Sequence, residues 1–207
     1  GNQILQSQRY KNAEVTAIDL SVSSLSYAQR KINELKLDNV ELVQMDILKV
    51  DLLEKKFDII ECGGVLHHMN DPSKGLEALL GVLKNDGFIK LGLYSKLARQ
   101  SIVKARKYIA LKRLQSNQDD IRNFRESIFS GKEQDLNSLK ESPDFYTLSS
   151  CRDLCFHSQE HRFNISKLQE TFKANDLKFL GFLLPQRIKT LYKNYFPEDK
   201  TQTNLQN

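Results

Sequence analysis

Short apolar runs alternate with amphipathic stretches along the first 94 residues. The runs are rich in Val, Ile and Leu, which favours β-strands, and the stretches between them carry apolar side chains at the three- and four-residue spacing of a helix. Expected strands cover residues 14–20, 39–45, 57–62 and 88–94, and expected helices cover residues 21–36 and 72–83. Ser21 and Asp71 are suited to capping these two helices, and Asn85-Asp86-Gly87 predicts a turn before the last strand. Strands and helices that alternate through short links predict an α/β fold with a doubly wound, mostly parallel sheet.

The pattern changes after residue 94. A basic amphipathic helix is expected over residues 96–115, with shorter helices at 118–130 and 133–139 and an irregular or loosely helical segment at 143–156. Residues 164–175 predict a helix capped by Asn164, residues 177–184 a fifth strand, and residues 186–207 a polar tail that frays. We therefore expect three parts: a βα core at 1–94, a mostly helical insertion or lid at 95–163, and a C-terminal helix, strand and tail at 164–207 that belong to the same domain as the core.

The stretch FDIIECGGVLHHM, residues 57–69, joins a strand to an exit loop that carries two glycines. The apolar run at Ile59 and Ile60 suits a strand that is buried on both faces. Gly63 and Gly64 let the backbone leave the sheet and approach a ligand closely. Because open α/β sheets bind ligands beyond the carboxyl ends of their strands, we expect the chemistry here. The plain alternative is a buried strand followed by an ordinary loop.

An acidic residue marks the end of each of the two preceding strands. Asp19 lies in the strand at residues 14–20, and Asp46 follows the strand at residues 39–45. Either one alone often serves only as a cap or turn residue. Together, ahead of the glycine-bearing exit loop, they indicate a shared ligand site at one edge of the sheet.

This combination, completed by a helix, a DG turn and a further strand, resembles the class I S-adenosylmethionine-dependent methyltransferases over residues 15–94. The resemblance implies that S-adenosylmethionine is the cofactor. It implies that Asp19 binds the ribose hydroxyls and Asp46 the adenine amino group, since a carboxylate accepts hydrogen bonds from both. Leu20 and Ile47 would then flank the adenine ring.

The same resemblance places the reacting end of the cofactor near the third strand. Cys62 and Gly63 would lie beside its methionine part, and the loop from His67 through His68 would line the entry of the substrate. A neutral imidazole accepts protons near neutral pH, so both histidines are candidate catalytic bases, with pocket lining as the alternative role. The expected substrate-pocket residues are Met69 and Tyr94.

The chain also departs from this family. The first strand and the GxGxG-type loop that cradles the cofactor are absent from the sequence, and Gly1 is the candidate for the last glycine of that loop. The family's closing antiparallel strand has no candidate after Tyr195. We therefore expect a truncated domain, a fragment of a longer methyltransferase, whose unpaired sheet edges close on each other or on a second copy in a homo-oligomer.

Composition narrows the functional classes. The 207 residues are 40% hydrophobic and 28% charged, with a net charge of +5. The sequence has no apolar run of the about 20 residues that span a bilayer, so a membrane partner is not expected. The odd number of cysteines, three, indicates reduced thiols and a cytoplasmic location. The basic run at residues 96–113 contains one aromatic residue, Tyr108, so a nucleic-acid partner is not expected either.

A cluster of possible metal ligands lies at Cys151, Cys155, His157 and His161. A single residue separates the Cys pair from the His pair, whereas structural zinc sites draw on two separated pairs, so no metal is expected. Cys62 has no neighbouring feature that would activate a thiol and is interpreted as a small buried residue.

These observations predict methyl transfer from S-adenosylmethionine to a small molecule or a protein side chain. The alternative is a non-catalytic relative that acts in oligomerisation or binds a partner through the helical insertion. A third hypothesis, an NAD-binding reductase, accounts for Asp19 but gives Asp46 no role.

Overall fold

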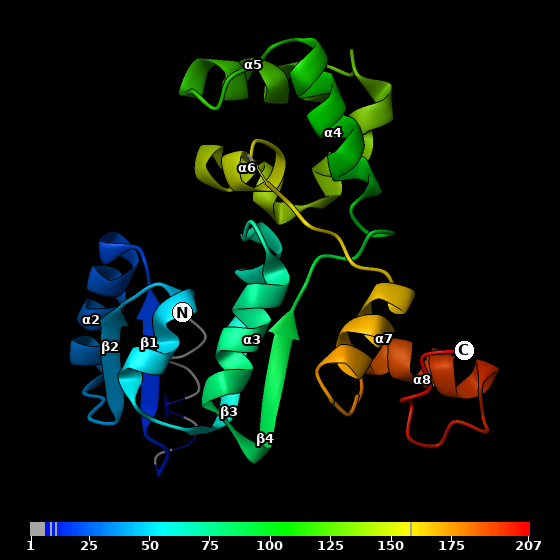
Figure 1. Ribbon diagram of the computed structural model, residues 1–207. Helices are drawn as coiled ribbons and strands as arrows, with labels where there is room; N and C mark the ends of the chain where they lie inside the picture. The colour runs from blue at the N-terminus through cyan, green and yellow to red at the C-terminus, as the bar shows by residue number, and fades with distance from the viewer. Residues whose placement is uncertain (1–6, 9, 11, 158) are drawn as a thin grey trace. The chain divides into compact units, whose positions relative to one another are not determined.

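The computed structural model describes residues 7, 8, 10, 12–157 and 159–207 of the chain. The chain forms two compact units, Gly1–Gly92 and Leu93–Asn207 (Figure 1). We refer to them as the N-terminal and C-terminal units. Gly1 lies outside the described residues, so its predicted role in cofactor binding stays a prediction.

The N-terminal unit contains the four predicted strands in two parallel pairs. Strand β1, Val15–Asp19, pairs with β2, Val40–Gln44, and β3, Phe57–Gly63, pairs with β4, Leu83–Gly92. Parallel neighbours require crossover connections, and the alternating strands and helices of the sequence supply them. The predicted parallel α/β architecture is therefore confirmed.

The connecting helices begin where the sequence predicts. Helix α2, Val22–Leu35, is capped by Ser21, whose side chain accepts a hydrogen bond from the Ser24 amide. Helix α3, Pro72–Val82, is capped by Asp71 and has proline at its first position. Two short 3₁₀ helices, η1 at Ile47–Leu53 and η2 at Leu66–His68, follow β2 and β3.

The turn predicted at residues 85–87 lies inside β4 instead. Leu83 already pairs with Phe57, and the register shifts before Phe88 pairs with Ile59. The extra residues form an irregularity in the strand rather than a separate turn. Gly87 is suited to this place because a Cβ there would lie 3.0 Å from the Asp58 carbonyl oxygen.

Strand β3 was expected to be buried on both faces, and this expectation is wrong for the described residues. Ile60 and Cys62 are buried, whereas Ile59 is 64% exposed and its register partner Phe88 is 56% exposed. Helix α3 and the elements packed with it cover one face of the pair, and Ile59 and Phe88 lie on the other face.

The C-terminal unit begins with a cluster of short helices that share one apolar core. The helices are α4 at Gln100–Leu111, α5 at Gln118–Phe129, η3 at Gln134–Glu141, η4 at Pro143–Phe145 and α6 at Leu148–Cys155. Phe124 and Phe145 are among the largest side chains in this core, with their ring centroids 6.1 Å apart. The segment expected to be irregular or loosely helical contains η4 and α6, and Thr147 caps α6.

The chain enters and leaves this helical cluster through two adjoining segments, residues 94–99 and 159–163, which we call the neck. The Lys96 amide donates to the Phe163 carbonyl, and the Phe163 amide donates to the Tyr94 carbonyl, both at 2.8 Å. Arg99 donates to the buried carboxylate of Glu160 and to the Leu154 carbonyl. A bidentate pair of this kind fixes the geometry of the two segments.

The C-terminal part differs from expectation in two ways. Helix α7, Ile165–Ala174, is capped by Asn164 as predicted, but residues 177–184 are extended without a strand partner among the described residues. Gly181, at φ +125°, interrupts that segment, and it faces the backbone of Gln202 rather than a neighbouring strand. The tail expected to fray forms helix α8, Gln186–Tyr195, and a hydrogen-bonded terminus.

Across the residues that the structure describes, helices long and apolar enough to cross a membrane are absent.

Candidate cofactor site

The two predicted acidic residues lie at the same edge of the β1–β2 pair. Asp19, the last residue of β1, is opposite Gln44, the last residue of β2, and Asp46 follows two residues later. The Met45 amide donates to the Asp19 carbonyl at 3.1 Å, which holds the two strand ends together. The parallel register therefore brings both carboxylates to one edge, as the sequence predicts.

Each carboxylate uses one oxygen to hold the local backbone. Asp19 Oδ1 accepts from the Ser21 amide at 2.8 Å, and Asp46 Oδ1 accepts from the Leu48 amide at 2.9 Å. Among the described residues, the second oxygen of each makes no hydrogen bond. The capping bonds orient the side chains, and the remaining oxygens are available to a ligand hydroxyl or amine.

An apolar residue follows each acid. Leu20 is 67% exposed and Ile47 is half-buried. The Gln44 side-chain amide donates to the Leu20 carbonyl at 3.3 Å and so ties this turn to β2. An exposed leucine beside two carboxylates suits a ligand that combines a planar apolar ring with polar groups.

The carboxyl ends of β3 and β4 meet at three glycines. A Cβ at Gly92 would lie 3.0 Å from the Gly63 Cα, so the two backbones approach closely here. Gly64 has a φ of +78°, and positions for a Cβ at Gly63 and Gly64 have no other atoms within 4 Å. This strand end is therefore open, and a ligand can lie directly on its backbone. Gly92 was not among the residues predicted from the sequence, although its place near the end of an expected strand was a usable signal.

Cys62 lies under this glycine pair and is 6% exposed. Burial raises the pKa of its thiol, and a hydrogen bond from the Leu66 backbone opposes the shift only in part. The raised pKa favours the neutral thiol, which is a weaker nucleophile than a thiolate.

The two candidate bases differ in exposure. His67 is 1% exposed, whereas His68 is half-buried, and their rings meet edge to face with centroids 4.4 Å apart. Met69 packs against α3 at Gly75, where a larger residue would collide with the Met69 sulfur. Of the two histidines, only His68 is accessible to a substrate in this conformation.

Tyr94 belongs to the C-terminal unit. Its ring stacks against the Arg99 guanidinium at 3.8 Å, and Arg99 is held in turn by Glu160. The sequence analysis missed both charged residues because they are 61 positions apart and only the fold pairs them. Arg106 also approaches Glu160, at 3.9 Å, so part of the basic charge of α4 is neutralised internally.

The residues that invited a zinc interpretation lie in α6, in the neck and in the link between them. Cys151 and Cys155 are buried in α6, and each has a free thiol. His157 Nδ1 pairs with the Gln159 carbonyl at 2.8 Å. The described residues contain no group of three or more His, Cys, Asp or Glu side chains arranged to hold a metal ion.

The N-terminal unit is similar to a known protein family. Residues 1–91 match the family model described as a methyltransferase domain. These residues belong to the methyltransferase domain family. The resemblance to class I methyltransferases is confirmed, and this domain contains both carboxylates and the glycine-lined strand end described above.

The likeness to other proteins extends beyond the methyltransferase domain. An uncharacterized protein from Synechococcus sp. is 33% identical over 180 residues, which is 83% of this chain and 43% of the relative. PKMT2 from Rickettsia typhi, solved in complex with AdoHcy, has a TM-score of 0.70 at 18% identity, covering 95% of this chain and 42% of that one. A second structure of PKMT2 gives a TM-score of 0.67 at 19% identity, covering 91% and 40%. The chain thus spans less than half the length of these relatives.

Proposed function

We propose that the methyltransferase domain binds S-adenosylmethionine and that the protein transfers its methyl group to a small molecule or a protein side chain. The observation that carries the proposal is the pair of carboxylates at the adjoining ends of β1 and β2, each with one oxygen held by its own backbone and the other available. The relationship to PKMT2, which was solved with AdoHcy, supports the choice of cofactor.

The residues present fit this cofactor. In this assignment Asp19 accepts from the ribose hydroxyls and Asp46 from the adenine amino group, with Leu20 and Ile47 against the ring. Gly63 lies beside the methionine part over buried Cys62, where the absence of side chains leaves room. When bound, the cofactor supplies an electrophilic methyl group, and the protein's task is to place a nucleophile in line with it.

We assign proton transfer in this reaction to His68 rather than His67. A base must come within hydrogen-bonding distance of the acceptor, and the half-buried ring of His68 meets that condition better than the buried ring of His67. His67 then supports His68 through their edge-to-face contact. Met69 remains the proposed lining of the acceptor site in the N-terminal unit, and the role expected for Tyr94, which belongs to the other unit, stays a prediction.

The cofactor assignment is tested by calorimetric titration of S-adenosylhomocysteine into the chain and into Asp19→Asn. The variant's side-chain oxygen still accepts from the Ser21 amide, so the turn is preserved while the charge and one acceptor are lost. We expect affinity to fall about tenfold to a hundredfold, as for the loss of hydrogen bonds to a charged group.

Asp38→Asn is the matched control, because Asp38 is exposed and lies in the loop before β2. The affinity of Asp38→Asn for S-adenosylhomocysteine should equal that of the parent chain. Equal affinity of the parent and Asp19→Asn would remove Asp19 from the site, and the absence of any binding by the parent would overturn cofactor binding by this chain.

A second candidate function is a non-catalytic role in self-association or partner binding. The observation that favours it is the exposed apolar pair Ile59 and Phe88 on one face of the β3–β4 pair. Catalysis and self-association are separable, since the first predicts a bound cofactor and the second a concentration-dependent mass.

We further propose that the protein acts in the cytoplasm and without nucleic acid. Its described cysteines are all free thiols, which suits a reducing compartment. Glu160, which approaches both Arg99 and Arg106, offsets one positive charge of the basic run that was a candidate for phosphate binding.

A further inference from the structure

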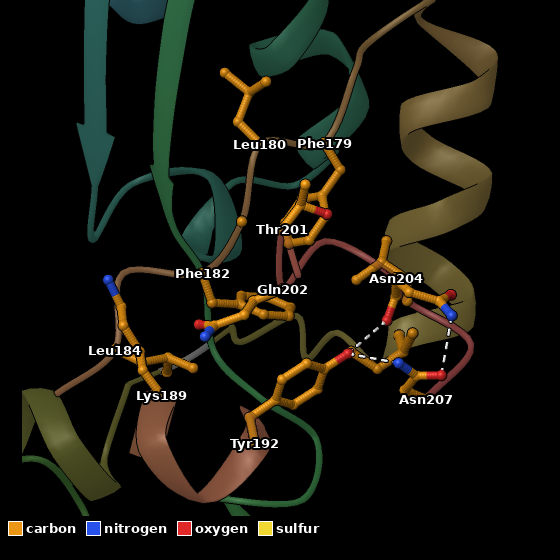
Figure 2. Close-up of a pocket in the computed structure, with 13 residues that line it drawn as sticks. Phe179, Leu180, Phe182, Leu184, Lys189, Tyr192, Thr201, Gln202, Asn204 and Asn207 are labelled. Carbon is orange, nitrogen blue, oxygen red and sulfur yellow. Dashed lines mark hydrogen bonds between the residues drawn. The ribbon is translucent and has the colours of Figure 1, made fainter. Parts of the chain in front are cut away.

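A pocket of about 160 Å³ lies between α7, α8, the extended segment at residues 179–184 and the C-terminal tail (Figure 2). Its lining includes Phe179, Phe182, Lys189, Tyr192 and Gln202. The pocket belongs wholly to the C-terminal unit, and the proposed methyl transfer does not use it.

Hydrogen bonds fix the wall that the tail contributes. The Tyr192 hydroxyl donates to Asp199 at 2.8 Å and accepts from the Asn207 amide at 2.8 Å. Asp199 also accepts from the Asn204 backbone amide at 2.9 Å, and the Asn204 side chain donates to Asn207. The tail is therefore held in place before any ligand arrives, which lowers the cost of binding.

One charged side chain lines the pocket, and the nearby Asp199 carboxylate is already occupied by its hydrogen bonds to Tyr192 and the tail. Lys189 is the only charged residue of the lining, it is half-buried, and its ammonium group makes no hydrogen bond or ion pair among the described residues. The side-chain amide of Gln202 is also without a partner there, and Gln202 adopts a φ of +57°, which non-glycine residues rarely do. A half-buried cation without a partner favours an anionic ligand.

The opposite wall is aromatic. Phe179 and Phe182 line the pocket edge to face with centroids 4.9 Å apart, and Phe172 stacks behind Phe179 at 5.6 Å. An additional ring could extend this series of aromatic contacts. The pocket is smaller than the about 300 Å³ or more of ordinary ligand sites, so it has room for one ring and a short anionic group.

We propose that this pocket binds a small aromatic monocarboxylate, with its carboxylate on Lys189 and Gln202 and its ring against Phe179 and Phe182. The alternative, a gap left by imperfect packing of the tail, predicts no preference for charge. The two are distinguished by a pair of probes that differ only in charge.

The experiment titrates phenylacetate and its neutral amide, phenylacetamide, into the whole chain and follows binding by saturation-transfer NMR. We expect saturable binding of phenylacetate that is at least about tenfold tighter than binding of the amide, because the ammonium contact is charge-assisted. Equal binding of both probes, or no saturable binding of phenylacetate, would overturn the proposal.

Matched variants locate the site. Lys189→Met should lose about tenfold in affinity for phenylacetate, whereas Lys193→Met, one turn further along α8 at an exposed position, should not change it. Phe182→Ala should weaken binding, whereas Leu183→Ala, a residue 76% exposed and outside the lining, should not. Circular dichroism checks that each variant folds. Equal affinities of the two lysine variants would place the ligand elsewhere.

Discussion

The lack of a side chain at Gly92 shapes the candidate site. It lets the ends of β3 and β4 approach until a Cβ would be 3.0 Å from the Gly63 Cα. That contact is with backbone, which yields less easily than a flexible side chain. The open surface over Gly63 and Gly64 therefore depends on a glycine in the neighbouring strand.

The corresponding prediction compares two glycines of the same domain. Gly92→Ala should destabilise the N-terminal unit by about 1–3 kcal/mol, as overpacking does, when unfolding is measured with urea. Gly81→Ala is the control, because its new methyl group meets no atom within 4 Å and Gly81 lies in α3, where alanine is favoured by about 0.5–1 kcal/mol. If Gly92→Ala had the same free energy of unfolding as the parent, the ends of β3 and β4 could separate without loss of stability, and the prediction would be wrong.

At the level of elements, Asp199 organises the C-terminal tail. Its carboxylate accepts from the Asn204 and Thr203 amides and from the Tyr192 and Thr201 hydroxyls. The Asn204 amide is the main cause that lowers the pKa of Asp199 to about 2, and desolvation opposes it. The charged carboxylate, rather than apolar burial, holds the tail against α8.

A pH titration tests this role. Because the folded pKa of Asp199, about 2, is below the ordinary value of 3.8, the tail's stabilisation is complete above pH 3.8 and is lost as the pH falls through about 2. We expect the NMR shifts of the Asp199 carboxyl carbon and the Asn204 amide to change together near pH 2. Asp199→Asn should abolish that step, and titration of Asp199 near 3.8 would contradict the prediction.

The sequence predicted those elements whose pattern is local. Strands β1 to β4 and the helices capped by Ser21, Asp71 and Asn164 follow from periodicity and capping chemistry, and the two acids follow from strand ends. The strand expected at residues 177–184 does not form, because a strand needs a hydrogen-bonded partner strand and an apolar composition alone does not supply one. The Arg99–Glu160 pair was missed for a related reason, since its members meet only through the neck.

At the scale of the whole molecule, one face of the β3–β4 pair remains uncovered in the described residues. Ile59 and Phe88 are neighbours in register there, and both are more than half exposed. Next to the pair on the same face, Lys90 binds Glu61, its register partner, at 3.3 Å. An apolar centre with a charged rim is typical of protein interaction surfaces.

The second candidate function therefore predicts self-association through this face. Light scattering across a concentration series should show a dimer whose fraction falls in Ile59→Lys, because a charge at the centre of the contact must be desolvated. Leu97→Lys is the control, since Leu97 is 77% exposed and lies in the C-terminal unit. A monomer at every concentration would exclude self-association through this face.

The neck has a consequence for how such a protein can diversify. Its two segments pair at Ser95 and Phe163, so the points where the chain departs for the helical cluster and returns from it are direct neighbours. The helical cluster between them has its own apolar core and is inserted into the chain at this one point. Residues can be gained, lost or exchanged inside it without redirecting the chain on either side, so evolution is free to change this module while the carboxylate-bearing strands stay as they are.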